Sequence, residues 1–290
     1  MRRLARKKEI RINFIMLISK KTKVCISIAG KPGDFGASVF SAAFEALSLD
    51  YIYKPFKVDP EELFDAIRGI RSFGIRGCGV SMPHKIKVMR YLDKIDPIAQ
   101  KVGAVNTIVN NKNVLSGYNT DFEGIKIALR ENYSDIKRVL IIGAGGVARA
   151  IILALKEINA GEIYLANRNQ NKSRKIVNEF GIKYVSYSER NNFSGDLLIN
   201  ATPIGMPPNT DRSIVSDNSI KRYRAVMDVV VSPNKTHLIK SAEKFGKKTI
   251  SGVQISLYQA TKQFKLYTGQ NAPINIMMKS VRDMWNNQNL

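Results

Sequence analysis

The sequence predicts an α/β protein with an N-terminal, mostly parallel α/β domain and a doubly wound second domain. Strand-like and helix-like segments alternate over most of the 290 residues, as in parallel sheets covered by helices. A glycine-rich turn at residues 143–146 separates an apolar run from a helix-like segment near the middle of the chain. The length suffices for two domains. We expect the first domain at residues 16–121, rejoined by residues 252–290, and the second at residues 122–251.

The first domain is predicted to begin with a strand at Lys23–Ala29, which is rich in β-branched residues and ends at a turn containing glycine and proline. The next segments alternate. They are a helix at 41–47, a strand at 51–56, a helix at 60–72, a strand at 77–81, a helix at 86–92, and a hairpin of 104–109 and 114–118 with its turn at 110–111. The residues Asn119-Thr-Asp121 directly follow the second strand of this hairpin.

The second domain is predicted to follow a helix at 122–131 and to contain four strands with helices between them. The strands are expected at 139–142, 162–166, 196–200 and 225–231, with a helix at 147–155 after the first. The last segment differs in kind, because residues 255–267 carry apolar side chains at helical spacing on one face: Leu257, Ala260, Phe264 and Tyr267. We expect this helix to return to the first domain.

The glycine turn has the order that a phosphate-binding βα turn requires. Glycine lets backbone N–H groups approach an anion closely, and the start of the following helix adds unpaired donors and the positive end of its dipole. The sequence therefore favours a dinucleotide bound by Gly143, Ala144, Gly145, Gly146 and Val147. Short glycine patterns also occur in turns that bind no ligand, so this alternative stays open at this point.

The strand at 162–166 ends about 20 residues after the turn, where a dinucleotide fold inspects the adenosine ribose. An NAD enzyme typically places a carboxylate there, whereas this chain has Asn167, Arg168 and Asn169, followed by Lys172. A guanidinium binds a 2′-phosphate through two parallel hydrogen bonds, and a carboxylate would repel it. The expected cofactor is therefore NADP. The alternative is that Arg168 and Lys172 are solvated charges of a basic protein.

The chain is strongly basic, with 46 Lys and Arg against 24 Asp and Glu and a net charge of +22. Such a field attracts anionic substrates and cofactors, and also nucleic acid or membranes. The positive residues are spread along the whole sequence, so a solvated surface is favoured and nucleic acid is not the expected partner. No uninterrupted apolar stretch is long enough to cross a bilayer, and no membrane partner is expected. A homodimer is left open.

The two cysteines, Cys25 and Cys78, both lie in apolar strand-like runs. Buried thiols indicate a reduced compartment rather than a disulfide framework. The N-terminal apolar run at 14–18 is too short for the core of a signal peptide. We therefore expect a cytoplasmic protein in which the residues before Met16 are an appendage to the fold.

Two ionisable side chains follow strand-like segments of the first domain, Lys85 and Asp121. A lysine oriented by a carboxylate can take a proton from an alcohol while hydride leaves for a nicotinamide. Spacing alone also allows Lys85 and Asp121 to form a surface ion pair that contributes little to stability and takes no part in catalysis.

The chain resembles the shikimate dehydrogenase family in a series of motifs that occur in the same order. They are Val80-Ser-Met-Pro-His-Lys85, Gly103-Ala-Val-Asn-Thr107, Tyr118-Asn-Thr-Asp121, Gly143-Ala-Gly-Gly146, Asn167-Arg168, Asn200-Ala-Thr-Pro-Ile-Gly-Met206, and Gln259 before Phe264 and Tyr267-Thr-Gly269. The resemblance covers nearly the whole chain after residue 22. It implies a substrate domain, a Rossmann NADP-binding domain and a C-terminal helix that returns to the first domain.

The resemblance also implies roles for individual residues. Reversible oxidation of a cyclohexene hydroxyl would use Lys85 as the acid–base residue and Asp121 as its partner. The implied substrate contacts are Ser81, Asn106 and Gln259, and Thr202 and Gly252 join the implied cofactor contacts. Ser38, or Ser41, is the candidate substrate contact in the loop after the first strand, where Asp34 would repel a carboxylate. The implied substrate is a small polyol carboxylate.

The sequence departs from the family where the substrate carboxylate is expected. Family members usually carry Ser-x-Ser-Pro after the first strand, and this chain has Gly33-Asp-Phe-Gly-Ala-Ser38 there. Gly79 stands in place of an asparagine, and Val231 in place of a tyrosine. Losing two or three hydrogen bonds to a charged group, each worth about 1.5–3 kcal/mol, would weaken substrate binding strongly unless other groups replaced them.

The chain most resembles the shikimate dehydrogenase-like branch of the family, which carries Phe-Gly in this loop and Gly-Ile-Arg-Gly-Cys before the lysine motif, here Phe35-Gly36 and Gly74-Ile-Arg-Gly-Cys78. We therefore expect weak oxidation of shikimate, or a related polyol carboxylate as the substrate. Arg76 is a candidate replacement ligand for the carboxylate, and an exposed charge at a strand edge is the alternative.

The expected function is NADP-dependent interconversion of shikimate, or a closely related cyclic hydroxy acid, and its 3-dehydro ketone. One alternative is an authentic shikimate dehydrogenase of aromatic amino-acid biosynthesis whose loop binds the carboxylate differently. A second alternative, of another class, is a catalytically quiet NADP-binding regulator. The presence of both Lys85 and Asp121 argues against the regulator.

Overall fold

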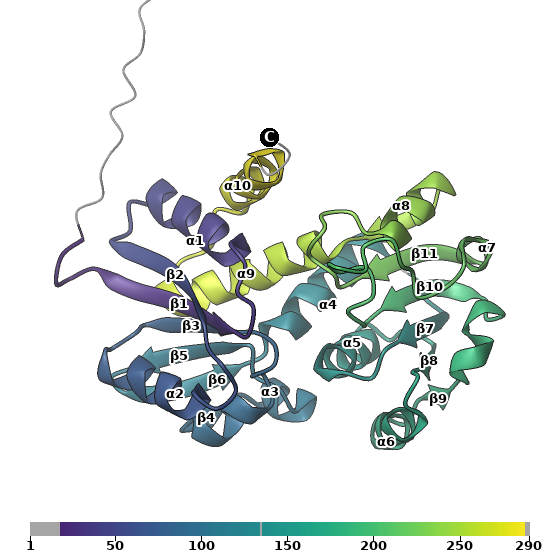
Figure 1. Ribbon diagram of the computed structural model, residues 1–290, viewed down its shortest axis with the longest axis horizontal. Coiled ribbons are helices and arrows are strands. Elements are labelled where there is room, and N and C mark those ends of the chain that lie inside the picture. The colour runs from purple at the N-terminus through teal and green to yellow at the C-terminus, as the bar shows by residue number, and fades with distance from the viewer. Residues whose placement is uncertain (1–17, 134, 288–290) are drawn as a thin grey trace, which may run out of the picture.

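The computed structural model describes residues 18–133 and 135–287, which form two α/β lobes (Figure 1). The appendage expected before Met16 lies outside the described residues. Helices α4 (Thr120–Asn132) and α9 (Gly252–Thr268) pack side by side between the lobes. Gly124 permits this close crossing, because a Cβ there would lie 2.7 Å from the Ile255 carbonyl oxygen. Within the described ranges, no helix combines the length and the apolar character that crossing a bilayer requires.

The first lobe contains a mostly parallel sheet, as predicted. Its strand order is β2-β1-β3-β5-β6-β4, with β1 at Lys23–Ala29, β2 at Tyr51–Lys57, β3 at Gly77–Val80, β4 at Lys94–Ile95, β5 at Thr107–Asn111 and β6 at Val114–Tyr118. β5 is antiparallel to both of its neighbours, and the other pairings are parallel. The helices of this lobe are α1 (Phe35–Ala46), α2 (Leu63–Ser72), α3 (Pro97–Val102), α10 (Ile274–Asn287) and a 3₁₀ turn at Lys87–Tyr91.

The second lobe is a Rossmann fold, as predicted. Its strands are β7 (Arg138–Ile142), β8 (Glu162–Ala166), β9 (Lys183–Tyr184), β10 (Gly195–Asn200), β11 (Tyr223–Asp228) and β12 (Lys248–Ile250). All pairings are parallel in the order β12-β11-β10-β7-β8-β9, the doubly wound arrangement of dinucleotide-binding domains. Helices α5 (Gly146–Glu157), α6 (Gln170–Phe180), α7 (Asp217–Ile220) and α8 (His237–Lys244) connect the strands, and a 3₁₀ turn occupies Tyr187–Asn191.

The structure corrects several sequence-based boundaries. The hairpin turns at Lys112 and Asn113, which both have positive φ, and not at 110–111. Asn110 resembles a turn former, yet it is buried in β5, where its amide donates to the Ile70 carbonyl and accepts from the Asn113 N–H. Strands β9 and β12 and helix α10 were not predicted, and the two strands are only two and three residues long.

The C-terminal helix returns to the first lobe, as predicted. The apolar face of α9 packs in one core cluster with side chains of β1, α1 and β2, and α10 covers α1 (Figure 1). This packing supports the proposed division into residues 16–121 with 252–290 and residues 122–251, of which 16, 17, 134 and 288–290 lie outside the described residues. The consequence for the site is that α9 reaches both lobes.

Candidate active site

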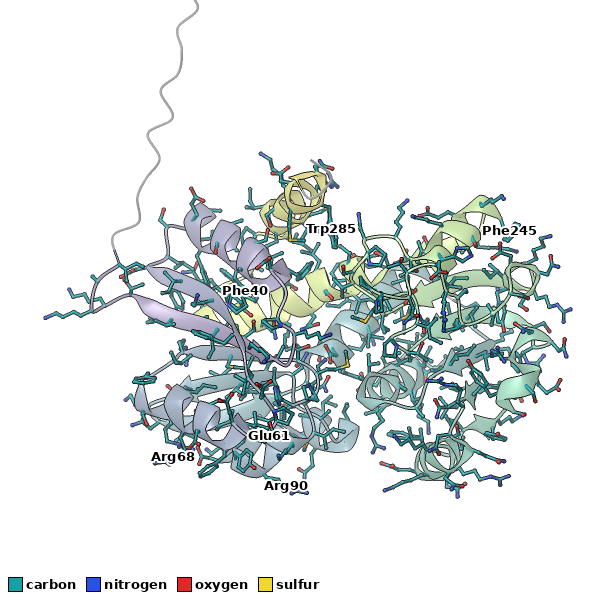
Figure 2. All side chains as sticks on the ribbon, viewed as in Figure 1. Phe40, Glu61, Arg68, Arg90, Phe245 and Trp285 are labelled. Atoms are coloured by element: carbon teal, nitrogen blue, oxygen red, sulfur yellow. The ribbon has the colours of Figure 1, made fainter. Side chains whose placement is uncertain are left out.

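A cavity of about 690 Å³ lies between the two lobes. The first lobe contributes the loop after β1 together with Lys85 and Asp121, and the second contributes Gly145 to Val147. Helix α9 adds Gln259, and α10 adds Trp285, which Figure 2 labels together with Phe40 of α1. The predicted acid–base pair and part of the predicted glycine turn therefore line one cavity.

The Lys85 ammonium donates to Asp121 at 2.7 Å, from Nζ to Oδ2. Asp121 is the second residue of α4, whose N-cap is Asn119, and the Asn119 side chain accepts from the Phe122 N–H. Both side chains are partly buried, at 25% and 11% exposure, so this pair is shielded more than a surface ion pair. The predicted contact between Lys85 and Asp121 is present.

The second carboxylate oxygen of Asp121 accepts from Asn106 at 2.7 Å. The Asn106 side-chain oxygen in turn accepts from the Thr120 N–H and from the Thr107 hydroxyl. Gln263 donates to that Thr107 hydroxyl at 2.8 Å. Asn106 therefore orients the carboxylate, and its substrate contact stays a prediction.

Gln263 was missed by the sequence reasoning. It lies one helical turn beyond Gln259 on α9, so the i, i+4 spacing of two glutamines on a helix predicted to reach the first domain was the available signal. Gln263 is 4% exposed, and it connects α9 to Asn106 and Thr107 at the start of β5.

The remaining predicted substrate residues fall into two groups. Ser81 and Gln259 line the cavity. Ser38 does not line it, because α1 begins at Phe35 and not at the expected residue 41, so Ser38 lies inside the helix and donates to the Ser280 carbonyl of α10. The structure therefore does not bring Ser38 to the cavity.

Arg76 does not replace the missing carboxylate ligands. Its guanidinium donates to the carbonyls of Tyr267, Leu266 and Asn110 at 2.9, 3.3 and 2.8 Å. It thereby binds the C-terminal end of α9, where the exposed carbonyls and the helix dipole favour a cation. Its role is structural, and it lies outside the lining of the cavity.

A second cavity of about 310 Å³ lies at the carboxyl ends of the Rossmann strands. Its lining includes most of the predicted cofactor residues, namely Gly143, Ala144, Gly145, Asn167, Arg168, Asn169, Lys172 and Thr202. Gly145 and Thr202 line both cavities, so the smaller cavity adjoins the one that contains the acid–base pair. Gly146 and Val147 line only the larger cavity.

Gly252 lies outside the lining of both cavities. It begins α9, and a Cβ there would lie 2.2 Å from the Val230 carbonyl oxygen. Glycine at this position lets the helix start against the loop after β11, which explains the residue without a cofactor contact.

The basic end of the smaller cavity fits a 2′-phosphate. Arg168 and Lys172 are exposed on the loop after β8 and the start of α6. Within the ranges 18–133 and 135–287, no carboxylate pairs with either side chain, so both cations are available to an anion. The Asn169 side chain caps α6 by accepting from the Lys172 N–H, which fixes the helix start beside the cavity.

Two glycines of the glycine turn have different surroundings, since Gly143 is crowded by protein atoms and Gly145 faces open space. Gly143 has φ of +121°, and a Cβ there would lie 2.5 Å from the Ala201 carbonyl oxygen. A Cβ at Gly145 would meet no protein atom within 4 Å. The open space at Gly145, between a strand end and a helix start, fits the pyrophosphate of a dinucleotide.

Gly145→Val is expected to raise the KM for NADP about tenfold or more, because the side chain would hold the pyrophosphate away from the backbone N–H groups. Its free energy of unfolding should change by less than about 1 kcal/mol, since the side chain meets no neighbour. Gly143→Val is the matched control, and its steric conflict should appear mainly as lost stability. Initial rates and urea unfolding distinguish the two, and an unchanged KM in Gly145→Val would contradict the assignment.

Asp228 is a buried carboxyl at the end of β11, beneath the loop that lines the larger cavity. It accepts from the Asn200 side chain, the Val230 N–H and the Thr236 hydroxyl. Burial raises the pKa of Asp228 to about 6, and these three donors oppose the shift. The folded state therefore holds this proton more tightly than the unfolded chain does.

The sign of the pH dependence follows from that shift. The Asp228 contribution to the free energy of unfolding is fully present below the ordinary pKa of 3.8 and is lost as the pH rises through about 6. Relative to Asp228→Asn, the wild type should lose up to about 3 kcal/mol between pH ~4 and ~7. Urea unfolding of both proteins across this range measures the difference, and parallel stability curves would refute it.

Comparison with known proteins identifies related sequences for both lobes. Residues 35–108 match the model of the shikimate dehydrogenase substrate-binding domain, and residues 126–231 match the model named shikimate / quinate 5-dehydrogenase. The chain is 40% identical to the shikimate dehydrogenase (NADP(+)) of Methanocaldococcus jannaschii over 281 residues, which covers 92% of this chain and 99% of the relative.

Solved structures give the same result. A shikimate dehydrogenase in complex with NADP+ superposes with a TM-score of 0.85 at 38% identity, covering 92% of this chain and 97% of that one. A shikimate 5-dehydrogenase-like protein superposes with a TM-score of 0.82 at 33% identity, covering 91% and 98%. The predicted resemblance is confirmed, and the chain belongs to the shikimate dehydrogenase family of NADP-dependent oxidoreductases.

Proposed function

We propose that this protein catalyses the NADP-dependent interconversion of shikimate, or a closely related cyclic hydroxy acid, and its 3-dehydro ketone. The observation that carries the proposal is the single cavity lined by the acid–base pair of one lobe and by the glycine turn of the other. It supports a reaction in which a hydroxyl beside Lys85 faces a nucleotide bound at Gly145. The family membership and the names of the relatives support the substrate class.

NADP, when bound, supplies the nicotinamide that accepts hydride from the carbon of the oxidised hydroxyl. The neutral Lys85 amine accepts the hydroxyl proton as that hydride leaves, and the Lys85 ammonium returns a proton to the carbonyl oxygen in the reverse direction. Asp121 holds the amine by its hydrogen bond and stabilises the ammonium that forms. Asn106 fixes the other oxygen of Asp121, so the carboxylate cannot rotate away from Lys85.

The position of the substrate carboxylate distinguishes the two enzyme hypotheses. The cavity lacks the serines, the asparagine and the tyrosine that the family places around the substrate carboxylate. Its lining at these places is formed by residues 32–36, by Gly79 and by residues 229–232. This lining supports weaker binding of shikimate, or a related polyol carboxylate as the better substrate. A cytoplasmic location, a homodimer and the absence of a nucleic-acid partner stay predictions.

Steady-state rates of NADP reduction by shikimate, quinate and related hydroxy acids test the proposal, with NAD as the comparison cofactor. We expect turnover of at least one cyclic hydroxy acid and a preference for NADP. Efficient turnover of shikimate at low concentration would contradict weak carboxylate binding and favour the biosynthetic enzyme. The absence of turnover with every acid would contradict the proposed function.

A further inference from the structure

A further contact between the lobes lies where α3 of the first lobe meets α5 of the second (Figure 1). Val102 and Ala104 are buried there in one core cluster with Ala148 of α5. A Cβ at Gly146, the first residue of α5, would lie 3.7 Å from the Ala104 Cβ. The start of α5, which belongs to the glycine turn, therefore rests directly on the end of α3 and the residues that follow it.

Arg149 of α5 adds a polar bond to this contact. Its Nε donates to the Val102 carbonyl, at the C-terminal end of α3, at 2.6 Å. The last carbonyls of a helix have no partner within the helix, and an arginine can satisfy them. The guanidinium also lies beside Gly103, where a Cβ would be 3.6 Å from the Arg149 Nε. One side chain of the Rossmann lobe thus holds the backbone of the first lobe.

The Arg149 guanidinium is oriented by the end of α6. Its two terminal nitrogens donate to the two carboxylate oxygens of Glu179, one of them at 2.8 Å. The guanidinium carbon lies 5.1 Å from the centroid of the Phe180 ring. A forked ion pair combined with an aromatic face holds a guanidinium in one orientation. Because the Arg149 side chain is only 21% exposed, it is a fixed link among α3, α5 and α6 rather than a solvated charge.

The segment that Arg149 holds continues into residues that fix the acid–base pair. The Val105 N–H donates to the Lys85 carbonyl at 2.8 Å. The Asn106 amide donates to the Asp121 carboxylate at 2.7 Å. Two consecutive residues therefore hold the backbone of the lysine and the side chain of its partner.

We propose that Arg149, oriented by Glu179, is a positioning residue that fixes the acid–base pair relative to the nucleotide bound at the glycine turn. It acts through residues 102–106 and lies outside the lining of both cavities. A shift of this segment relative to α5 would displace the reacting groups, and a misplacement of about 1 Å can slow a reaction about 100-fold. The inference rests on the proposed function and adds the residue that couples its two halves.

Arg149→Met removes the guanidinium and keeps an unbranched side chain. The rate of hydride transfer in a single turnover of shikimate, or of the best acid found, should fall about 10- to 100-fold. The Kd for NADP should change by less than about threefold, because Arg149 does not line the nucleotide cavity. Rates are expressed per NADP-binding site, so that a loss of folded protein does not lower them. A rate within about twofold of wild type would overturn the proposal.

Glu179→Ala tests the orienting pair, and Glu157→Ala is its matched control. The two glutamates are similarly exposed, at 40% and 44%, and each pairs with a cation of a neighbouring helix, which for Glu157 is Lys126 of α4. Glu179→Ala should slow hydride transfer in wild type and have no further effect in the Arg149→Met background. Glu157→Ala should keep the wild-type rate. Equal rates in the two alanine variants would overturn the proposal, also where Arg149→Met fails to fold.

Failure of the proposed function can be recognised separately, because the arrangement of the lobes can be measured without turnover. Trp285, the only tryptophan of the chain, belongs to α10 in the first lobe and lines the larger cavity. Energy transfer from this side chain to NADPH bound at the glycine turn depends steeply on their separation. The fluorescence lifetimes of Trp285 therefore report how the two lobes are placed.

At saturating NADPH, these lifetimes should be distributed more broadly in Arg149→Met and Glu179→Ala than in wild type and Glu157→Ala, because the lobes sample more arrangements. Equal distributions in all four proteins would overturn the proposal. Broader lifetimes in the first two variants, together with no turnover of any acid by wild type, would support the role of Arg149 and contradict the proposed function.

Discussion

Lys85→Met is expected to lower kcat for oxidation of the hydroxy acid about a thousandfold. Methionine keeps the length of the side chain but cannot accept the hydroxyl proton, and it leaves Asp121 without its 2.7 Å partner. Binding of NADP should be retained, because Lys85 does not line the nucleotide cavity. Initial rates and equilibrium titration with NADP measure the two effects.

Lys87→Met is the matched control for this experiment. Lys87 lies two residues further on, is exposed, and donates to the Pro60 carbonyl outside the cavity. Its kcat should equal that of wild type. A Lys85→Met protein that retained a tenth or more of the wild-type kcat would remove Lys85 from the proton transfer.

Arg168→Asp is expected to lower kcat/KM for NADP about 100-fold or more and to raise it for NAD. The substitution removes a bidentate donor to the 2′-phosphate and adds a carboxylate that repels this phosphate and accepts from the 2′-hydroxyl of NAD. The ratio of kcat/KM for NADP to kcat/KM for NAD measures the cofactor preference. This ratio should therefore fall to about one or below.

Arg174→Asp separates this local effect from the positive field of the whole protein. It changes the charge by the same amount on α6, the helix that follows Arg168, but the Arg174 guanidinium lies over the Tyr184 ring and outside the lining of the nucleotide cavity. Its cofactor preference should match that of wild type. Equal losses in both variants would mean that the net charge, and not Arg168, attracts NADP.

The contact between Lys85 and Asp121 was predictable because both residues belong to motifs that follow strands. β3 and β6 run parallel on either side of β5, so their carboxyl ends lie at the same edge of the sheet. The doubly wound class of the Rossmann lobe likewise follows from the glycine turn and the alternation of elements, whereas the short strands β9 and β12 at its edges gave no signal. Arg76 shows where this reasoning stops. The sequence around Arg76 carries no signal for the carbonyls that its guanidinium meets, two at the end of α9 and that of Asn110 in β5.

The place of the Tyr53 side chain in the lining of the larger cavity could not be predicted from the sequence for a related reason. Its position depends on the absence of side chains at Gly36 and Gly79, which are contributed by two other elements. A tyrosine in a strand predicts only a half-buried side chain. Ser38 was misplaced because the turn formers before it concealed the early start of α1 at Phe35.

The measurement that tests the central claim most directly uses shikimate, or the best acid found, with deuterium on the carbon that bears the oxidised hydroxyl. After turnover with NADP, the deuterium should be recovered in the nicotinamide ring of NADPH, because Lys85 of one lobe and the glycine turn of the other line a single cavity. Deuterium found in the solvent, with none in NADPH, would contradict direct transfer between the substrate and the cofactor.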